Sequence, residues 1–444
     1  MAKGDLSTIG LIVLLFGEIV AASSTTGTAQ GAFNQGISAI WIFVGKGLGA
    51  ILFALFFARF YTEAGKAGCM SIPETFKWRF DERVRYVAVL VILVPLMLTC
   101  STQCKAFASI LSPLLGLDAH VLIIAVGLLF AILACTGLKG TANMNLLHSG
   151  VLFFGIMVAA IFCVVSSGGL DQVVSELPKE YLNPLYPSTL KIGGDFITAA
   201  LAFTIAVTPT NACFSSANIR SSQVALAVVG VIISVFALFP VIIGLVGFAN
   251  FPNVDANSIL YIMPESVSPV FSVVVSMAVL AAVLSSAPFL FLSAATILVR
   301  DIAIKIKPNL EEKTQMKMTY TIIFIVAAFA IYFGINTSTL FAQIIGAAHI
   351  KATAAMVIIA GMVWKRFTNN AAFWAFLVSG ILAIFFFFSG SVFGLQIEPF
   401  WPTCAIEIVL MVVITFVDKK HQFKDYEAYR SRCACAGGEP SESI

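Results

Sequence analysis

Charge is scarce in this sequence. Only 11% of its 444 residues are charged, whereas 59% are hydrophobic; an ordinary soluble domain carries roughly 25% charged residues. This scarcity excludes a chain made mainly of soluble domains and points to the lipid bilayer as its solvent. The formal net charge of +3 is too small to suggest nucleic acid as a partner. We therefore expect a polytopic membrane protein.

The sequence also lacks the residue clusters that an intramembrane enzyme needs. Its four histidines are scattered, at His120, His148, His349 and His421, and no His-Glu-x-x-His motif is present. Because catalysis requires a nucleophile with its base, or a metal-ligand cluster, we expect no enzyme and no cofactor beyond a coupling ion. A transporter-like membrane sensor is the alternative from another class, although the tail from Lys419 onward is short for a signalling domain.

The hydrophobic residues gather in runs that are long enough to cross a bilayer. A membrane helix needs about 20 such residues, since its backbone groups must be hydrogen-bonded within the helix. The sequence predicts an all-α membrane protein with about twelve transmembrane helices. These are expected near residues 7–31, 37–61, 84–114, 119–137, 144–167, 194–212, 222–249, 268–303, 315–335, 340–364, 370–390 and 398–418.

Basic residues mark one side of these helices. With the N-terminus placed inside, 21 of the 26 Lys and Arg residues fall in cytoplasmic segments and only Lys179 and Lys191 fall in outside loops. This asymmetry is what the positive-inside rule predicts for an even number of helices. We expect a multi-pass protein of the cell (inner) membrane with both termini in the cytoplasm. The 21 residues are Lys3, Arg59, Lys66, Lys77, Arg79, Arg83, Arg85, Lys139, Arg220, Arg300, Lys305, Lys307, Lys313, Lys317, Lys365, Arg366, Lys419, Lys420, Lys424, Arg430 and Arg432.

Three segments together resemble the sodium/solute symporter family. They are Ser71-Ile-Pro-Glu-Thr-Phe-Lys-Trp-Arg-Phe after the second helix, Leu284-Ser285-Ser286 leading to Arg300-Asp301, and Trp364-Lys365-Arg366 before the eleventh helix. Each string alone is a weak signal, but all three stand at matching places in a twelve-helix chain. The resemblance covers residues ~7–418.

The resemblance implies the leucine-transporter-type fold, in which two five-helix repeats have opposite topology and the first helix of each is broken at mid-membrane. It divides the chain into a first repeat at 7–167, a second repeat at 194–364, two further helices at 370–418 and a cytoplasmic tail at 419–444. It also implies sodium-coupled symport of a small solute by alternating access. The oligomeric state is not predicted.

The composition of the first helix supports a break there independently. The segment from Gly17 to Gly27 places two glycines, four hydroxyls and the carboxylate of Glu18 at roughly mid-membrane depth, where polar groups are costly and usually functional. An unwound turn would free carbonyl oxygens for a cation. Close helix packing through small residues is the alternative for the glycines. In the second repeat, the corresponding break is expected within Thr204, Thr208, Pro209, Thr210 and Asn211.

The resemblance also implies a sodium site. Relatives bind the ion between two carbonyls of the first helix and one carbonyl plus two hydroxyls of the eighth, and these positions correspond here to Gly17, Val20, Ala282, Ser285 and Ser286. Five oxygens suit a hard cation. The serine hydroxyls could instead donate to carbonyls four residues earlier. Where the family shows Thr-Asp and a following Gln on the fifth helix, this chain has Met144-Asn145 and His148, which favours one sodium per cycle.

Mid-membrane charges indicate the solute. At 1.5 Å rise per residue, Glu18, Lys46 and Lys351 each lie about ten residues from a membrane face. A sugar is disfavoured, because the positions that hold sugar hydroxyls in relatives correspond to Ile19, Ser24 and Phe43 here. If Glu18 neutralises one lysine, the other can bind a carboxylate, so an organic acid or an amino acid is expected. A structural ion pair, a cationic amine held by Glu18, and coupling to protons remain alternatives. The expected solute-binding residues are Glu18, Ser23, Ser24, Lys46, Thr208 and Lys351.

Overall fold

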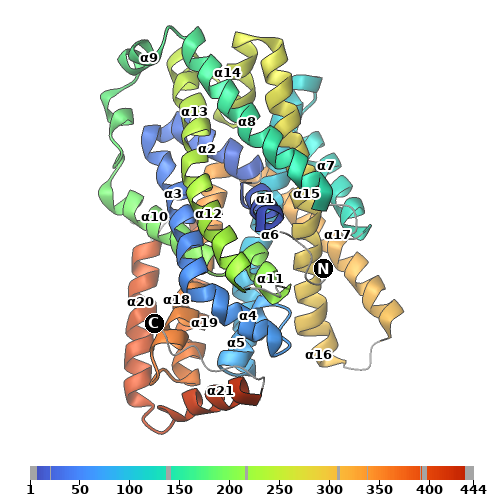
Figure 1. Ribbon diagram of the computed structural model, residues 1–444, viewed down its shortest axis with the longest axis vertical. Coiled ribbons are helices and arrows are strands. Elements are labelled where there is room, and N and C mark those ends of the chain that lie inside the picture. Colours follow the sequence, from blue (N-terminus) through green and yellow to red (C-terminus); the bar gives the residue numbers. More distant parts are fainter. Residues whose placement is uncertain are drawn as a thin grey trace.

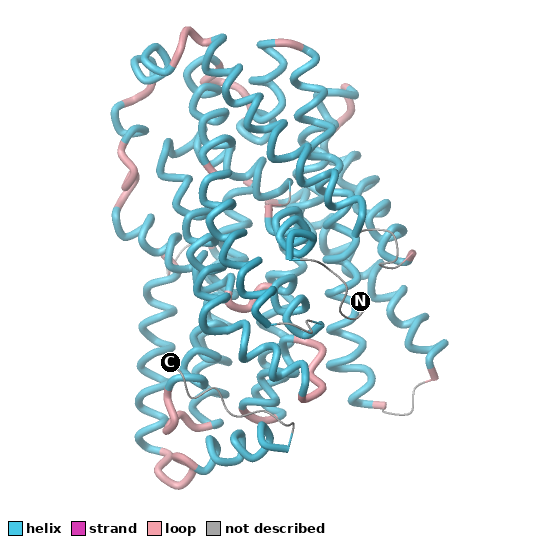
Figure 2. The backbone as a smooth tube through the Cα atoms, in the orientation of Figure 1, coloured by secondary structure: helices cyan, strands magenta, loops and turns pink. Residues whose placement is uncertain are grey.

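A computed structural model describes residues 8–20, 22–136, 142–215, 219–307, 311–337, 339–390, 392 and 398–435 of the chain. Helices make up nearly all of the described residues and are joined mostly by short loops (Figure 2). Ten helical segments among these residues are long and apolar enough to cross a membrane, and two shorter apolar helices accompany them. Each of the twelve predicted helices overlaps at least one of these segments, and the first, 7–31, overlaps two.

The apolar segments contain the following elements in chain order: α1 (Thr8–Ile19), α2 (Ala22–Gln35), η1 (Gly36–Ala39), α3 (Ile40–Leu52), η2 (Phe53–Phe57), α4 (Ala58–Lys66), α6 (Glu82–Leu115), α7 (Ala119–Cys135), α8 (Ala142–Ser166), α10 (Thr189–Phe203), α11 (Val207–Ser215), α12 (Ile219–Phe236), α13 (Leu238–Asn250), α15 (Pro269–Leu298), η6 (Val299–Ala303), α16 (Ile304–Ile306), α17 (Glu312–Asn336), α18 (Leu340–Val363), α19 (Asn369–Ser389) and α20 (Phe400–Val417). Shorter elements lie between or after them: α5 (Ile72–Arg79), α9 (Leu170–Glu176), η4 (Lys179–Leu182), η5 (Ala256–Ser258), α14 (Ile259–Val267) and α21 (Lys424–Cys435). In Figure 1, α9 and α14 lie at one end of the bundle and α5, α16 and α21 at the other.

Two membrane segments are broken into half-helices, and a third, Ile219–Asn250, is interrupted at the single turn residue Ala237. The first breaks between Ile19, where α1 ends, and Ala22, where α2 begins, and the second breaks at 204–206, between α10 and α11. A break leaves carbonyls without helical partners, and in a membrane other groups must satisfy them. The hydroxyl of Tyr61 donates to the Thr204 carbonyl at 3.0 Å, so a side chain from α4 supports the second break.

Glycines let α3 approach α10 and α12 closely. A Cβ at Gly45 would lie 2.6 Å from the Phe196 carbonyl oxygen of α10, and one at Gly47 would lie 2.5 Å from the Gly230 carbonyl oxygen of α12. Only a residue without a side chain fits such contacts between membrane helices. Lys46 lies between these two glycines, so the same packing that joins the three helices also fixes the position of this lysine.

The first of the three segments that carry the family resemblance contacts the end of the second segment and the part of α18 just before the third. Helix α5 of the first segment lies at one end of the bundle (Figure 1). Ser71, directly before α5, donates from its hydroxyl to Asp301 Oδ1 at 3.3 Å. Arg79, the last residue of α5, is fully buried and donates from Nε to the carbonyl of Gly361 in α18. Burial lowers the pKa of Arg79 to about 10, so it remains charged at neutral pH. The α5 segment therefore joins Asp301 to the end of α18.

The tail carries a helix that the sequence analysis did not predict. Helix α21 packs on α5, and Arg432 donates from Nε to the Trp78 carbonyl at 2.9 Å. The rings of Trp78 and Tyr429 also meet edge to face, with centroids 5.0 Å apart. Because the last carbonyls of a helix have no partner within it, the Arg432 guanidinium caps the end of α5.

Candidate functional site

A cavity of about 170 Å³ lies at the centre of the bundle, beside both helix breaks. A cavity of roughly 150 Å³ can hold a molecule of the size of benzene, so this one has room for a small organic solute. Helices α1, α2, α3, α6, α10, α11, α15 and α18 contribute to its wall. The lining residues are Ile19, Ser24, Lys46, Leu96, Thr99, Thr102, Gln103, Ala199, Ala202, Phe203, Ala206, Val207, Thr208, Pro209, Leu290, Gln343, Ile344, Ala347, Ala348 and Lys351.

Two lysines line this central cavity. Lys46 donates from Nζ to Ser24 Oγ at 3.1 Å and lies 4.9 Å from the centre of the Phe43 ring. Within the described chain, Lys351 has no hydrogen bond or ion pair, and no described carboxylate pairs with Lys46 either. Buried ammonium groups are costly without a negatively charged partner. The cavity wall therefore carries positive charge that is not compensated by the described side chains.

The ends of two half-helices add to this charge. Ser24 lies in the first turn of α2, and Thr208 lies in the first turn of α11. Both side chains line the central cavity. A helix N-terminus presents unpaired N–H groups and the positive end of the helix dipole. The two breaks thus direct partial positive charges toward the space that the lysines also face.

Four of the six predicted solute-binding residues are brought together by the structure. Ser24, Lys46, Thr208 and Lys351 line the central cavity. The side chains of Glu18 and Ser23 lie outside the described residues. The proposed pair between Glu18 and Lys46 therefore remains a prediction.

Polar residues of α6 and α18 also line the cavity and were not among the predicted site residues: Thr99, Thr102, Gln103 and Gln343. The hydroxyls of Thr99 and Thr102 donate to backbone carbonyls of α6, at 2.7 and 2.8 Å, so their oxygen lone pairs are their contribution to the cavity. Polar residues within an apolar run were the available signal. That signal does not say which side of a helix faces the cavity.

The predicted sodium ligands lie on α1, its break and α15, and these two helices are in contact. The Ser286 hydroxyl donates to the Ala282 carbonyl at 2.9 Å, the backbone contact that the sequence analysis left open as an alternative role. This bond uses the hydroxyl hydrogen and leaves an oxygen lone pair available to a cation. The carbonyl of Val20 accepts a long bond of 3.5 Å from Thr25 Oγ1. The Ser285 side chain lies outside the described residues.

Comparison with known proteins identifies a matching protein family. The model of the sodium:solute symporter family matches residues 1–379. Sodium-coupled monocarboxylate transporter 2 of Bos taurus is 24% identical over 287 residues, which cover 61% of this chain and 46% of that protein. The sodium/iodide cotransporter of Homo sapiens is 26% identical over 162 residues, covering 36% of this chain and 25% of that protein. The chain spans less than half the length of either relative.

Solved structures show the same fold. A Na⁺-coupled sialic acid symporter in a substrate-bound, outward-open state matches with a TM-score of 0.75 and 16% identity, over 94% of this chain and 91% of that one. Mhp1, a nucleobase-cation-symport-1 family transporter in a closed conformation, matches with a TM-score of 0.61 and 12% identity, over 97% of both chains. These likenesses confirm the predicted leucine-transporter-type architecture.

Proposed function

Since this chain belongs to the sodium:solute symporter family, we propose that it is a sodium-coupled symporter that imports a small organic carboxylate by alternating access. The observation that carries the solute class is the pair of lysines, Lys46 and Lys351, in one central cavity of about 170 Å³. A carboxylate can accept charge-assisted hydrogen bonds from ammonium groups, which are roughly twice as strong as neutral ones. It would also compensate positive charge in a medium of low dielectric constant.

The half-helix ends favour the same solute. A carboxylate near the first turns of α2 and α11 would meet the N–H groups around Ser24 and Thr208, an arrangement that suits anions. The apolar part of the solute would contact Phe203, Leu290 and Ile344, which line the cavity. The small cavity favours a solute of a few carbon atoms over a larger one.

The names of the similar proteins agree with an anionic solute. Among them, one is called a monocarboxylate transporter, one an iodide cotransporter and one a sialic acid symporter. These names describe those proteins, and monocarboxylate and sialic acid contain the functional group that we propose for this chain. A cationic amine is disfavoured because the two lysines would repel it.

An amino acid is the second candidate, and it depends on Glu18. In that case the lysines would bind the solute carboxylate and Glu18 would bind its ammonium group.

We propose that the sodium ion lies against the break of the first membrane segment, held by the carbonyls of Gly17, Val20 and Ala282 and the hydroxyls of Ser285 and Ser286. We further propose the cell membrane as the location, with both termini in the cytoplasm.

Uptake into proteoliposomes tests this function. Purified full-length protein would be reconstituted, and uptake of radiolabelled C2–C4 monocarboxylates, neutral amino acids, primary amines and iodide would be measured with an inward sodium gradient. We expect carboxylate uptake that disappears when potassium replaces sodium. Matched liposomes without protein give the background. Sodium-driven uptake of amines alone would contradict the proposed solute class, and uptake of every solute without sodium would contradict symport.

A further inference from the structure

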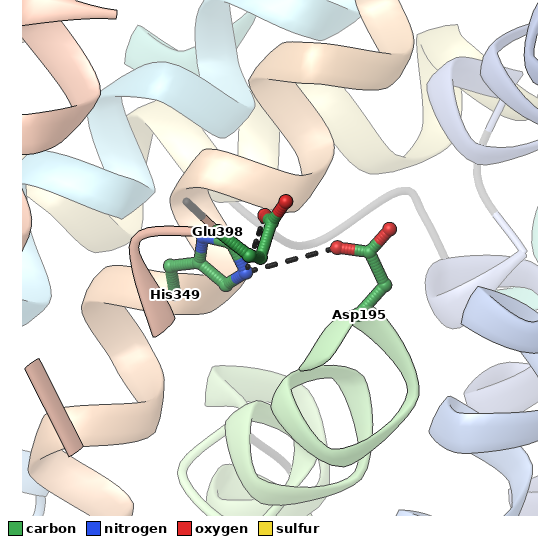
Figure 3. A group of neighbouring side chains, drawn as sticks. All are labelled: Asp195, His349 and Glu398. Atoms are coloured by element: carbon green, nitrogen blue, oxygen red, sulfur yellow. Dashed lines mark ion pairs between the residues drawn. The ribbon is translucent and has the colours of Figure 1, made fainter. Parts of the chain in front are cut away.

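A second cluster of ionisable side chains lies outside the central cavity. It consists of Asp195 on α10, His349 on α18 and Glu398 just before α20, and it is called the three-helix cluster below. Figure 3 shows the three side chains pointing toward one another from three separate parts of the chain. None of the three lines the central cavity, and the histidine was expected from the sequence to be isolated.

The distances within the cluster suit ligands that share an ion. His349 Nε2 lies 3.8 Å from Asp195 Oδ1 and 3.6 Å from Glu398 Oε1, and one ligand atom from each residue lies within 4.8 Å of the other two. Direct hydrogen bonds would be shorter, at about 2.7–3.2 Å. Zinc binds nitrogen and oxygen ligands at roughly 2.0–2.2 Å in tetrahedral geometry, which separates neighbouring ligands by about 3.3–3.6 Å. Zinc binding would draw the three ligand atoms closer together.

The atoms that face this space are buried and unsatisfied. Asp195 is 3% exposed and His349 is 8% exposed. Neither Asp195 Oδ1 nor His349 Nε2 has a hydrogen-bond partner among the described residues. Buried polar atoms nearly always have a partner, so two such atoms directed at one point indicate a missing ligand.

Lys191 satisfies only the far side of the two carboxylates. Its Nζ lies 3.0 Å from Asp195 Oδ2 and 3.8 Å from Glu398 Oε2, and this leaves Oδ1 and Oε1 directed at His349. One lysine against two carboxylates also leaves one negative charge over. A cation between the three ligands would balance the remaining charge.

The surrounding contacts hold the cluster in place. The Trp401 indole donates to the Leu190 carbonyl at 2.9 Å and so joins the start of α20 to the start of α10. The Phe400 ring stacks on His349, with centroids 6.1 Å apart. Such neighbours orient ligand side chains before an ion arrives.

We propose that Asp195, His349 and Glu398 form a zinc site that joins α10, α18 and the segment before α20. An imidazole nitrogen with two carboxylate oxygens suits zinc better than sodium, calcium or magnesium, which prefer oxygen ligands alone. The site is separate from the proposed sodium site, which uses α1 and α15. Water would complete the coordination, because Glu398 is partly exposed at 15% of its side chain.

Calorimetric titration tests the site on purified full-length protein in sodium-containing detergent buffer after removal of trace metals. We expect one zinc ion per chain, no binding of magnesium at the same concentration, and affinity at least tenfold lower in Glu398→Gln and in His349→Gln. The control is His120→Gln, because His120 lies 3.8 Å from Asp118 as an exposed pair and should be unaffected. Equal zinc affinity in the wild type, Glu398→Gln and His349→Gln would overturn the proposal.

A ligand variant that folds poorly would also lose zinc binding. A variant that is expected to bind zinc more tightly avoids this ambiguity. Lys191→Gln retains all three ligands and removes the competing cation, so it should bind zinc about two- to tenfold more tightly. Unchanged or weaker binding in Lys191→Gln would count against the site. If His120→Gln lowers the zinc affinity as much as His349→Gln does, zinc binds only to surface residues, and this result would also reject the proposed site.

Discussion

Lys46 donates a hydrogen bond of 3.1 Å from Nζ to Ser24 Oγ and thereby joins α3 to the first turn of α2. The bond places an ammonium group directly beside the break of the first membrane segment. Since the glycines on either side of Lys46 let α3 pack closely against α10 and α12, backbone packing sets the position of this charge. The proposed sodium and carboxylate sites then both adjoin one helix break.

Removal of the Lys351 charge should weaken solute binding. For Lys351→Met, we expect the KM for the transported carboxylate to rise about ten- to a hundredfold, because a hydrogen bond to a charged group contributes roughly 1.5–3 kcal/mol. Lys351→Arg should retain part of the affinity. Lys179→Met is the control, because Lys179 is exposed and does not line the central cavity. Uptake kinetics in proteoliposomes measure the effect. An unchanged KM in Lys351→Met would remove this lysine from the solute site.

Substitution of Ser286 should alter sodium dependence specifically. Ser286→Ala, and likewise Ser285→Ala, should raise the sodium concentration for half-maximal uptake about ten- to a hundredfold, equivalent to roughly 1–3 kcal/mol for loss of a buried polar partner. The matched control is Thr296→Ala, because Thr296 is on the same helix and also donates to a carbonyl four residues earlier. If Ser286→Ala and Thr296→Ala have equal effects, the serine has only the backbone role.

A double mutant separates the possible roles of Glu18. If Glu18 pairs with Lys46, then Glu18→Gln and Lys46→Met should each impair uptake, and the double variant should recover part of the loss because no unpaired buried charge remains. If Glu18 instead binds a solute ammonium group, amino acid uptake should be lost without recovery in the double variant. Wild-type uptake by Glu18→Gln would reject both roles. Initial rates at matched protein abundance are the measurement.

Zinc should slow transport if the three-helix cluster binds it, an expectation that rests on the proposed function. His349 and Lys351 lie on the same helix, so zinc would hold α18 against α10 while α18 lines the solute cavity. We expect micromolar zinc to reduce uptake by the wild type and by His120→Gln, and to have little effect on Glu398→Gln. Equal inhibition of the wild type, His120→Gln and Glu398→Gln would show that zinc acts at another site. If the wild type transports no carboxylate even without zinc, the result would contradict the proposed function and would not test the cluster.

Cysteine labelling tests the orientation in the membrane. On a background without native cysteines, an impermeant maleimide added outside cells should label cysteines placed near Lys179 and should miss those near Arg79, Lys313 and Lys424. Permeabilised cells provide the control, since every position should then react. Labelling in the reverse pattern would invert the proposed topology.

The helices and the first break could be predicted because both are local consequences of the bilayer. Backbone groups in lipid must be satisfied within the helix, so apolar runs such as 340–364 predict helices directly, as α18 shows. The polar segment from Gly17 to Gly27 marked the first break for the same reason. Of the five residues expected at the second break, only Thr204 lies in it, and Thr208, Pro209, Thr210 and Asn211 belong to α11. Lys46 and Lys351 were recognised by depth alone, since a charge at mid-membrane is costly wherever its helix packs.

Only the tertiary structure decided which of these groups meet. Asp195, His349 and Glu398 are separated by long stretches of sequence and were each unremarkable alone, and Gln343 joined the central cavity only through the rotation of α18. The docking of α21 on α5 likewise depends on Arg432 reaching the Trp78 carbonyl. Helix formation depends on neighbours within a few residues, whereas convergence of side chains depends on close packing between helices, to which small residues such as Gly45 contribute.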